Sequence, residues 1–144
     1  MHNRMNAEYT VYISCPSLSS LSLDNRYLEN GKIVRDSVAN ERWYAKNELS
    51  GFVSDSLLIN QDNGSYLVMD SNKITRFGAT VGASSGSQPI LEIAKGNIIN
   101  SARFNIESNT DFRLYAPVSA LDLHMSDTAT ISLSGNATNI LHNK

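Results

Sequence analysis

The sequence predicts an all-β fold, either β-solenoid-like or a sheet of stacked short strands, with at most one or two short helices. Apolar and polar residues alternate over much of the chain, and this is the period of a strand rather than of a helix. From residue 90 onward, alternating pairs recur at short, even intervals separated by Asn, Ser, Asp and Gly. Such two-faced strands at regular spacing are typical of a solenoid coil or of an antiparallel meander.

Length and composition are consistent with one domain and exclude some classes of partner. The 144 residues predict one β-rich domain spanning residues 1–144, large enough to bury a core. Charged residues make up 18% of the chain and the net charge is −2, with Lys and Arg scattered singly. No basic stripe offers a footprint for nucleic acid, so we expect no nucleic-acid partner. No apolar run approaches the roughly 20 residues of a membrane-spanning helix, so we expect no transmembrane segment.

The first predicted strands flank a proline. In residues 9–14, Val11 and Ile13 face one way and their neighbours the other, and Pro16 ends the strand. A second short strand is predicted at residues 18–23. The single cysteine, Cys15, excludes an intramolecular disulfide and a Cys-rich zinc site, and we interpret it as a small buried hydrophobe.

The next segments are less regular. Residues 24–31 are predicted to form a loop closed by Asn30-Gly31, and residues 32–38 a strand. Residues 40–49 are the best helix candidate, because Asn40 is a good cap and several helix formers follow before Ser50-Gly51.

The strongest local signal is a predicted β-hairpin. Residues 57–60 and 66–69 flank Asn63-Gly64, and an Asn-Gly pair tolerates the positive φ that tight hairpin turns need. A further strand pair is predicted at residues 73–77 and 79–81, followed by a flexible Gly/Ser loop at residues 82–89. The later strands are centred on the alternating pairs Leu91/Ile93, Phe104/Ile106, Phe112/Leu114, Leu121/Leu123 and Ile131/Leu133, with Ile140 in a last short apolar pair.

Two similar segments of the sequence suggest a repeated unit. Residues 12–23 resemble residues 113–123: each has a strand, a small residue, a proline, a short link and a Leu-x-Leu strand, with one residue of slack. Residues 112–140, with the unit at 12–24, resemble the head GIN domain found in the autotransporter-adhesin-like family. The family's repeated Ser-Gly turns survive here only at Ser134-Gly135. The resemblance implies a β-solenoid-like fold and a cell-envelope location, and it implies no catalytic residues.

Candidate catalytic residues do not assemble into a recognisable constellation. The histidines are His2, His124 and His142, with no metal-binding spacing, and His124 is expected to be exposed on a strand. Residues 82–86 match the Gly-x-Ser-x-Gly string around Ser84, but no helix pattern follows, so a flexible loop is the better interpretation. The scattered acids (Asp55, Asp62, Asp70, Glu92, Glu107, Asp111, Asp122 and Asp127) admit a glycosidase or lyase on a β-helix, although most are placed at predicted turns.

Arg42, Trp43 and Tyr44 form the candidate ligand-binding cluster, because flat aromatic rings stack on sugars or peptides. The alternative is that Trp43, the single tryptophan, anchors a short helix on the sheet. No catalytic residue, metal site or cofactor is predicted.

The sequence therefore favours a non-enzymatic, extracytoplasmic surface module, adhesin-like, that acts through protein or glycan contacts. Its expected partners are a second copy of itself, an envelope protein or a glycan, since exposed strand edges attract other strands. Two alternatives stay open: a carbohydrate-active enzyme on a β-helix, and a phage or particle assembly protein. The chain shows no signal sequence of its own, so a cytoplasmic location also stays open.

Overall fold

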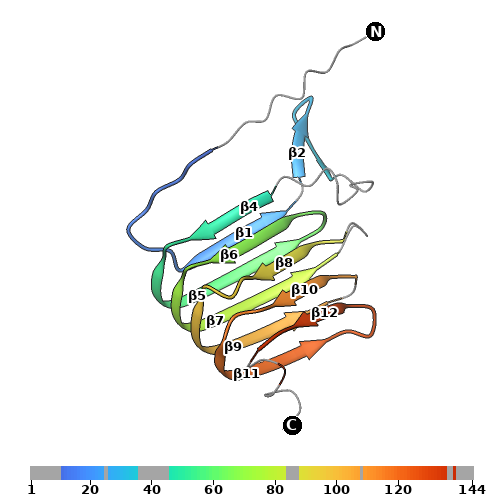
Figure 1. The fold of residues 1–144 in the computed structure, drawn as a ribbon. Coiled ribbons are helices and arrows are strands. Elements are labelled where there is room, and N and C mark those ends of the chain that lie inside the picture. Colours follow the sequence, from blue (N-terminus) through green and yellow to red (C-terminus); the bar gives the residue numbers. More distant parts are fainter. Residues whose placement is uncertain are drawn as a thin grey trace.

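The computed structural model describes residues 11–24, 26–35, 46–83, 88–107, 109–135 and 138. These residues form an all-β structure that is 64% strand, has no helix, and makes about four turns of a β-solenoid. Figure 1 shows the coils stacked from the N-terminal to the C-terminal end, with two layers of strands in each coil. The predicted all-β, solenoid-like fold class is confirmed.

Two five-stranded sheets form the layers, and all of their strand pairs are parallel. Sheet 1 contains, in spatial order, β1 (Ser20–Asp24), β5 (Val53–Asp62), β7 (Lys73–Gly82), β9 (Ile98–Ile106) and β11 (Val118–Met125). Sheet 2 contains β4 (Lys46–Ser50), β6 (Tyr66–Asp70), β8 (Ile90–Ile93), β10 (Asp111–Leu114) and β12 (Thr130–Leu133). From β4 to β12 the chain alternates between the sheets, so each coil supplies one strand to each layer.

The register stacks equivalent residues of successive coils into rows. Leu58 pairs with Gly78, Gly78 with Arg103, and Arg103 with Asp122. Because successive side chains of a strand point to opposite faces, every second row faces inward. One coil therefore presents its polar residues to solvent beside those of the coils above and below it.

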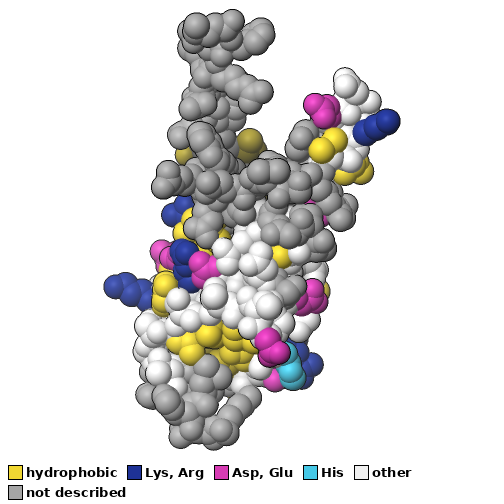
Figure 2. Space-filling view, turned by 90° about the vertical axis from the view of Figure 1, so that its right-hand side faces the viewer, with side chains coloured by type: hydrophobic (Ala, Val, Ile, Leu, Met, Phe, Trp, Pro, Cys, Tyr) yellow, Lys and Arg dark blue, Asp and Glu magenta, His cyan; other side chains and the backbone are white. Residues whose placement is uncertain are grey.

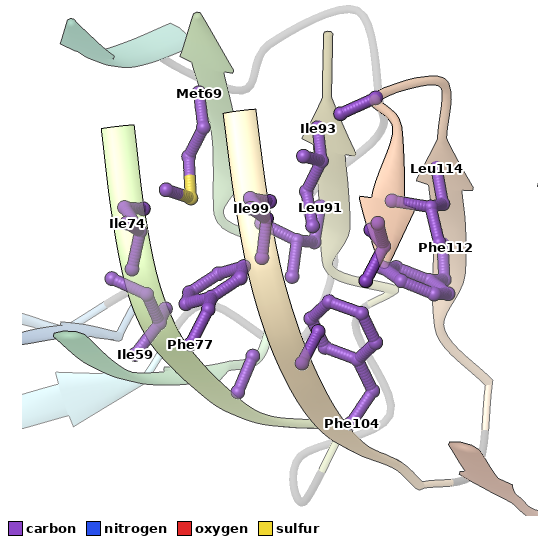
Figure 3. Close-up of a cluster of buried hydrophobic side chains, with 14 of the residues drawn as sticks. Ile59, Met69, Ile74, Phe77, Leu91, Ile93, Ile99, Phe104, Phe112 and Leu114 are labelled. Carbon is purple, nitrogen blue, oxygen red and sulfur yellow. The ribbon is translucent and has the colours of Figure 1, made fainter. Parts of the chain in front are cut away.

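The inward rows form the hydrophobic core between the two sheets. Phe104 lies between Phe77, whose ring it meets edge-on at 5.3 Å, and Phe112, whose centroid is 4.8 Å away. Figure 3 shows these rings surrounded by aliphatic side chains from both sheets. Every alternating pair predicted between residues 91 and 133 lies in a strand. Within the core cluster, members of the final pair, Ile131 and Leu133, are only partly buried.

A buried amide ladder holds one corner of the solenoid, where the chain passes from sheet 2 to sheet 1. Asn72 and Asn97 occupy equivalent positions just before β7 and β9 and are fully buried. The Asn72 amide nitrogen donates to the Leu49 carbonyl at 2.9 Å and to Asn97 Oδ1 at 2.9 Å. Asn97 Nδ2 in turn donates to the Met69 and Ala94 carbonyls. The Met69 and Ala94 carbonyls thus accept a side-chain donor in addition to a backbone N–H, and Asn97 Oδ1 also accepts from the buried backbone N–H of Asn72.

The predicted hairpin at Asn63-Gly64 is wrong. β5 and β6 lie in different sheets, so the segment between them turns a solenoid corner instead of joining antiparallel neighbours. Only Asn63 has a positive φ, of 56°, and its side chain donates to Asp24 Oδ1 at 2.8 Å in the coil above. Both strands have an apolar face, and placing them on opposite sides of the core buries both faces.

The loop predicted at residues 24–31 is wrong for residues 26–29, which form a strand that ends at a tight turn of Asn30-Gly31. β2 (Arg26–Glu29) and β3 (Lys32–Arg35) pair antiparallel around this turn, in which both residues have positive φ. The predicted strand at residues 32–38 is confirmed for the residues of β3. Because β2 and β3 form a sheet of their own, this hairpin is an insertion between β1 and β4.

Two further predictions are corrected. Residues 46–49 of the predicted helix belong to β4, because Leu49 fills the inward row that continues in Met69 and Ile93, and burial overrides helix propensity. Residues 40–45 lie outside the described part of the chain. The predicted strand pair at 73–77 and 79–81 is one strand, β7, because Gly78 pairs in register on both sides.

Of the predictions for the N-terminal part of the chain, one is confirmed and two are not. β1 confirms the strand predicted at residues 18–23, within two residues at its start. Residues 11–14 of the predicted strand 9–14 are not in a strand. Cys15, expected to be buried, is half-buried and unpaired.

Candidate functional site

A shallow groove crosses the outward face of sheet 1. Its volume is about 630 Å³, and it runs over the middle of β5, β7, β9 and β11. The outward-facing residues that line it are Ser56, Leu58, Arg76, Gly78, Ser101, Arg103, Ala120 and Asp122. Small residues form its floor because Gly78, Ser101 and Ala120 project little above the sheet. The volume is within the range of small-ligand sites, although the groove is open to solvent.

Gly78 and Leu58 shape the floor together. A Cβ added to Gly78 would meet Leu58 Cδ1 at 3.2 Å, so the leucine side chain leans over the glycine in the next strand. Leu58 itself is 46% exposed and so offers an apolar surface to solvent. The groove therefore combines an apolar contact with polar walls, as binding sites for amphipathic ligands do.

Arg103 and Asp122 line one side of the groove, and His124 contacts Asp122 beside it. Arg103 Nε lies 3.0 Å from Asp122 Oδ2, and His124 Nε2 lies 3.2 Å from Asp122 Oδ1. The side chains of Arg103 and His124 are 79% and 70% exposed. Figure 2 shows acidic, basic and histidine side chains gathered beside a hydrophobic patch on this side of the molecule. Exposed pairs of this kind contribute little to stability, so these groups stay available to a ligand.

Arg76 is the second cation of the groove. It lies on β7, where the consecutive residues Thr75 and Arg76 are both exposed. Among the residues that the structure describes, Arg76 has no hydrogen-bond or ion-pair partner. Arg76 pairs with Ser101, which lies two residues before Arg103 on the neighbouring strand β9. The two guanidinium groups therefore face solvent across the small residues Gly78 and Ser101.

The outward face of sheet 2 carries a different cluster, formed by Tyr66, Glu92, Asp111 and Arg113. Arg113 Nη2 lies 2.6 Å from Asp111 Oδ2, and its Nη1 lies 3.5 Å from Glu92 Oε2. The Tyr66 hydroxyl donates to Glu92 Oε2 at 3.1 Å. The guanidinium carbon also lies 6.0 Å from the centre of the Tyr66 ring. All four side chains are thus engaged with one another.

This cluster seals the sheet surface beneath it. Ile90 occupies the outward row between Tyr66 and Asp111, yet only 3% of it is exposed. Partial burial, reinforced by the hydrogen bond to Glu92, raises the pKa of Tyr66 above its usual value. The hydrogen bond to Asp111 raises the pKa of Arg113. The tyrosine is therefore held neutral, as a donor, and the cluster acts as a cover for apolar surface.

The structure brings together few of the predicted site residues. Arg42, Trp43 and Tyr44, the predicted ligand-binding cluster, lie outside the described residues, as do Ser84, His2 and His142. His124 is exposed on β11 as predicted, and its partner is Asp122. Of the scattered acids, Glu92 and Asp111 meet through Arg113, while Asp55 lies within β5 and Asp62 is its last residue.

The sequence reasoning missed both arginines of the groove. Arg76 and Arg103 are 27 positions apart in the printed sequence and belong to no motif. Only the coil register places them on neighbouring strands. A search for charged residues recurring near the coil length would have found Arg103 and Asp122, which are 19 residues apart.

Comparison with known proteins identifies no relative: no family model, no curated protein and no solved structure matches the chain. Within the described ranges, no three His, Cys, Asp or Glu side chains are grouped so that they could hold a metal ion. The same ranges contain no helix long and apolar enough to cross a membrane.

Proposed function

We propose that this chain is a non-enzymatic, adhesin-like surface module of the extracytoplasmic space that binds an extended acidic glycan across sheet 1. The observation that supports this function is the groove, in which Arg76 and Arg103 stand on a rigid parallel sheet. The resemblance of residues 112–140 to the head GIN domain supports the envelope location.

The chemistry of the groove favours an acidic ligand. A guanidinium group matches the geometry of a carboxylate or sulfate and binds it through two parallel hydrogen bonds. Arg76 has no partner among the described residues, and Arg103 has one exposed carboxylate, so an anionic ligand meets little competition.

The shape of the groove favours a polysaccharide. Adjacent strands lie about 4.8 Å apart, close to the length of one sugar unit in an extended chain. A glycan that crosses the strands therefore meets an equivalent position of each coil in turn. Ser56 and Ser101 offer hydroxyl groups to sugar hydroxyls, and Leu58 offers an apolar contact to a ring face.

A binding measurement tests this function. The purified chain is titrated with a uronate-bearing polysaccharide, a sulfated polysaccharide and a neutral one. We expect binding to at least one acidic polymer, weakening with added salt, and no binding to the neutral polymer. Arg76→Ala is expected to weaken binding by about tenfold, which corresponds to about 1.4 kcal/mol.

Lys73→Ala is the matched control, because Lys73 is an exposed cation on the same strand but lies outside the groove. If both variants lost the same amount of binding, the effect would follow from net charge alone, and a site in the groove would be contradicted. The tagged gene product is expected to fractionate with the cell envelope, and a cytosolic location would contradict the extracytoplasmic part of the proposal.

A carbohydrate-active enzyme is the second candidate, and one observation favours it. Glu92 and Asp111 lie on neighbouring strands of one solvent-facing sheet, the arrangement that paired-carboxylate hydrolysis uses. Arg113 contacts both carboxylates, however, so the two groups are engaged with a side chain of the protein itself. Polysaccharide hydrolysis that is abolished in Glu92→Gln would decide for this candidate.

A further inference from the structure

Within the described residues, the first coil of the solenoid has no strand in sheet 2. In the coils that follow, a short sheet 2 strand precedes each sheet 1 strand: β4 precedes β5, β6 precedes β7, β8 precedes β9, and β10 precedes β11. β1 has no such strand before it among the described residues. β4, at the end of sheet 2, accordingly has β6 as its only strand partner in the described part of the chain. One edge of β4 is thus open to a further parallel strand.

The segment that precedes β1 has the composition of the missing strand. Val11, Tyr12 and Ile13 are β-branched or aromatic, and such residues favour strands. In the structure they are 79%, 91% and 82% exposed, the largest fractions among the described large apolar residues. Figure 1 shows this segment, in dark blue, apart from β4. Three consecutive residues of this type rarely remain in water when a strand edge lies near.

The similarity between residues 12–23 and 113–123 predicts the register in which the segment would pair with β4. Tyr12, Ile13 and Pro16 match Arg113, Leu114 and Pro117, and the matching residues of the later unit lie in β10 and at the corner that leads to β11. Ile13 therefore belongs to the inward row of Leu114, Ile93, Met69 and Leu49. Tyr12 belongs to the outward row of Arg113 and Glu48. Docking in this register buries Val11 and Ile13 over the end of the core and leaves Tyr12 on the surface.

The segment is already tethered beside its docking place. The Ser19 carbonyl accepts a 2.9 Å hydrogen bond from the Leu58 backbone, and the Leu18 carbonyl accepts one of 3.1 Å from the Ser54 hydroxyl. A hollow between Ile13–Pro16 and Ser50–Val53 separates the segment from the corner that follows β4. A short tether gives the segment a high effective concentration at its own sheet edge, so closure within one chain prevails over pairing with a second copy.

We propose that residues 11–14 form a strap that closes onto the open edge of β4 as an additional parallel strand and completes the first coil. The occupant of the edge is this chain's own segment. The closed strap covers a strand edge that would otherwise attract other strands, so it also protects the N-terminal end of the solenoid from association.

Disulfide trapping tests the strap in the full chain, with Cys15→Ser as the background. In the proposed register Tyr12 lies directly opposite Glu48, within the separation that a disulfide bridges. We expect Tyr12→Cys/Glu48→Cys to form an intramolecular disulfide in several-fold higher yield than Tyr12→Cys/Lys46→Cys. The control is matched because Lys46 is exposed and lies on the same strand, two residues from Glu48. Products are distinguished by non-reducing electrophoresis and mass spectrometry.

Equal yields in the two pairs would overturn the proposed register. A predominance of disulfide-linked dimers would show that the edge accepts the strap of a second copy, and would overturn closure within one chain. Backbone hydrogen exchange of the cysteine-free chain gives an independent readout. We expect the amides of residues 12–14 to exchange several-fold more slowly than in Val11→Gly/Ile13→Gly, whereas equal rates would overturn the strap.

Discussion

The outward faces of the two sheets differ in how their charges are used. On sheet 2, Arg113 is bound to Asp111 and Glu92, Tyr66 donates to Glu92, and the cluster covers Ile90. On sheet 1, Arg103 and His124 share one exposed aspartate, and Arg76 has no partner among the described residues. Both faces stand on parallel ladders of strands, and they differ in how their side chains are paired.

This difference separates a stabilising face from a binding face. Partly buried charges that satisfy one another stabilise the fold and leave little capacity for a ligand. Exposed charges with few partners stabilise the fold very little and bind a ligand without first breaking internal bonds. The comparison therefore predicts that substitutions on sheet 2 change stability, whereas substitutions on sheet 1 change binding.

The largest effect is expected where the scaffold shared by both faces is broken. Asn97→Leu removes the buried Oδ1 that accepts from both the backbone and the side-chain N–H groups of Asn72. It also removes the side-chain donor to the Met69 and Ala94 carbonyls, which keep their backbone donors. Each buried group left unpaired costs about 1–3 kcal/mol, so we expect a loss of about 3 kcal/mol or more in the free energy of unfolding, measured with urea. Asn100→Leu, at an exposed position of the same strand, is the control. Similar losses in both variants would contradict a structural role of the ladder.

Arg113→Ala tests the stabilising face. The substitution leaves Asp111 and Glu92 facing each other without their cation and uncovers Ile90, so we expect a loss of about 1–2 kcal/mol in unfolding free energy. Polysaccharide binding should be retained. The equivalent change on sheet 1, Arg103→Ala, should leave the urea midpoint unchanged, because its ion pair is exposed. If Arg103→Ala destabilised the chain as much as Arg113→Ala, the two faces would not differ.

Tyr66→Phe sharpens the same comparison with a smaller change. Loss of the hydrogen bond to Glu92 is expected to cost about 0.5–1.5 kcal/mol at neutral pH. Because burial raises the pKa of Tyr66 in the folded chain, its contribution is present below the ordinary tyrosine pKa and is lost as the pH rises through the raised value. The stability gap between wild type and variant should therefore close at alkaline pH. A gap that widens with pH would contradict the assigned partner.

Arg76→Ala is expected to have the smallest effect on stability. Arg76 is exposed and has no partner in the described residues, so the unfolding midpoint should not move. Its effect should appear in binding to an acidic polysaccharide. A clear loss of stability without a loss of binding would reverse the assignment of the two faces.

Much of the fold is predictable from the sequence because the period of its apolar residues is local information. The alternation at Leu91/Ile93 and Phe112/Leu114 specifies strands with one buried face, whatever lies beside them. The Asn-Gly turn between β2 and β3 follows from the same kind of rule, since both residues need positive φ. The exposed position of His124, opposite its apolar neighbours, also follows from alternation.

Other features depend on contacts between coils and so are absent from any local pattern. Residues 46–49 have helix-forming side chains, but the inward row of Leu49, Met69 and Ile93 makes them a strand. The turn at Asn63-Gly64 has a hairpin sequence, but the core between the sheets makes it a corner.

The sequence by itself determined the class of element, the inward and outward side chains of most strands, and the absence of a familiar catalytic motif. Only the tertiary structure decided which strands are neighbours, and hence which charges meet. Arg103 reaches Asp122, and Arg113 reaches Glu92, because parallel pairing sets each residue beside the one about a coil away. The length of a coil varies with the insertions at its corners, so the register is specified by the packing of all inward rows together and not by any one segment.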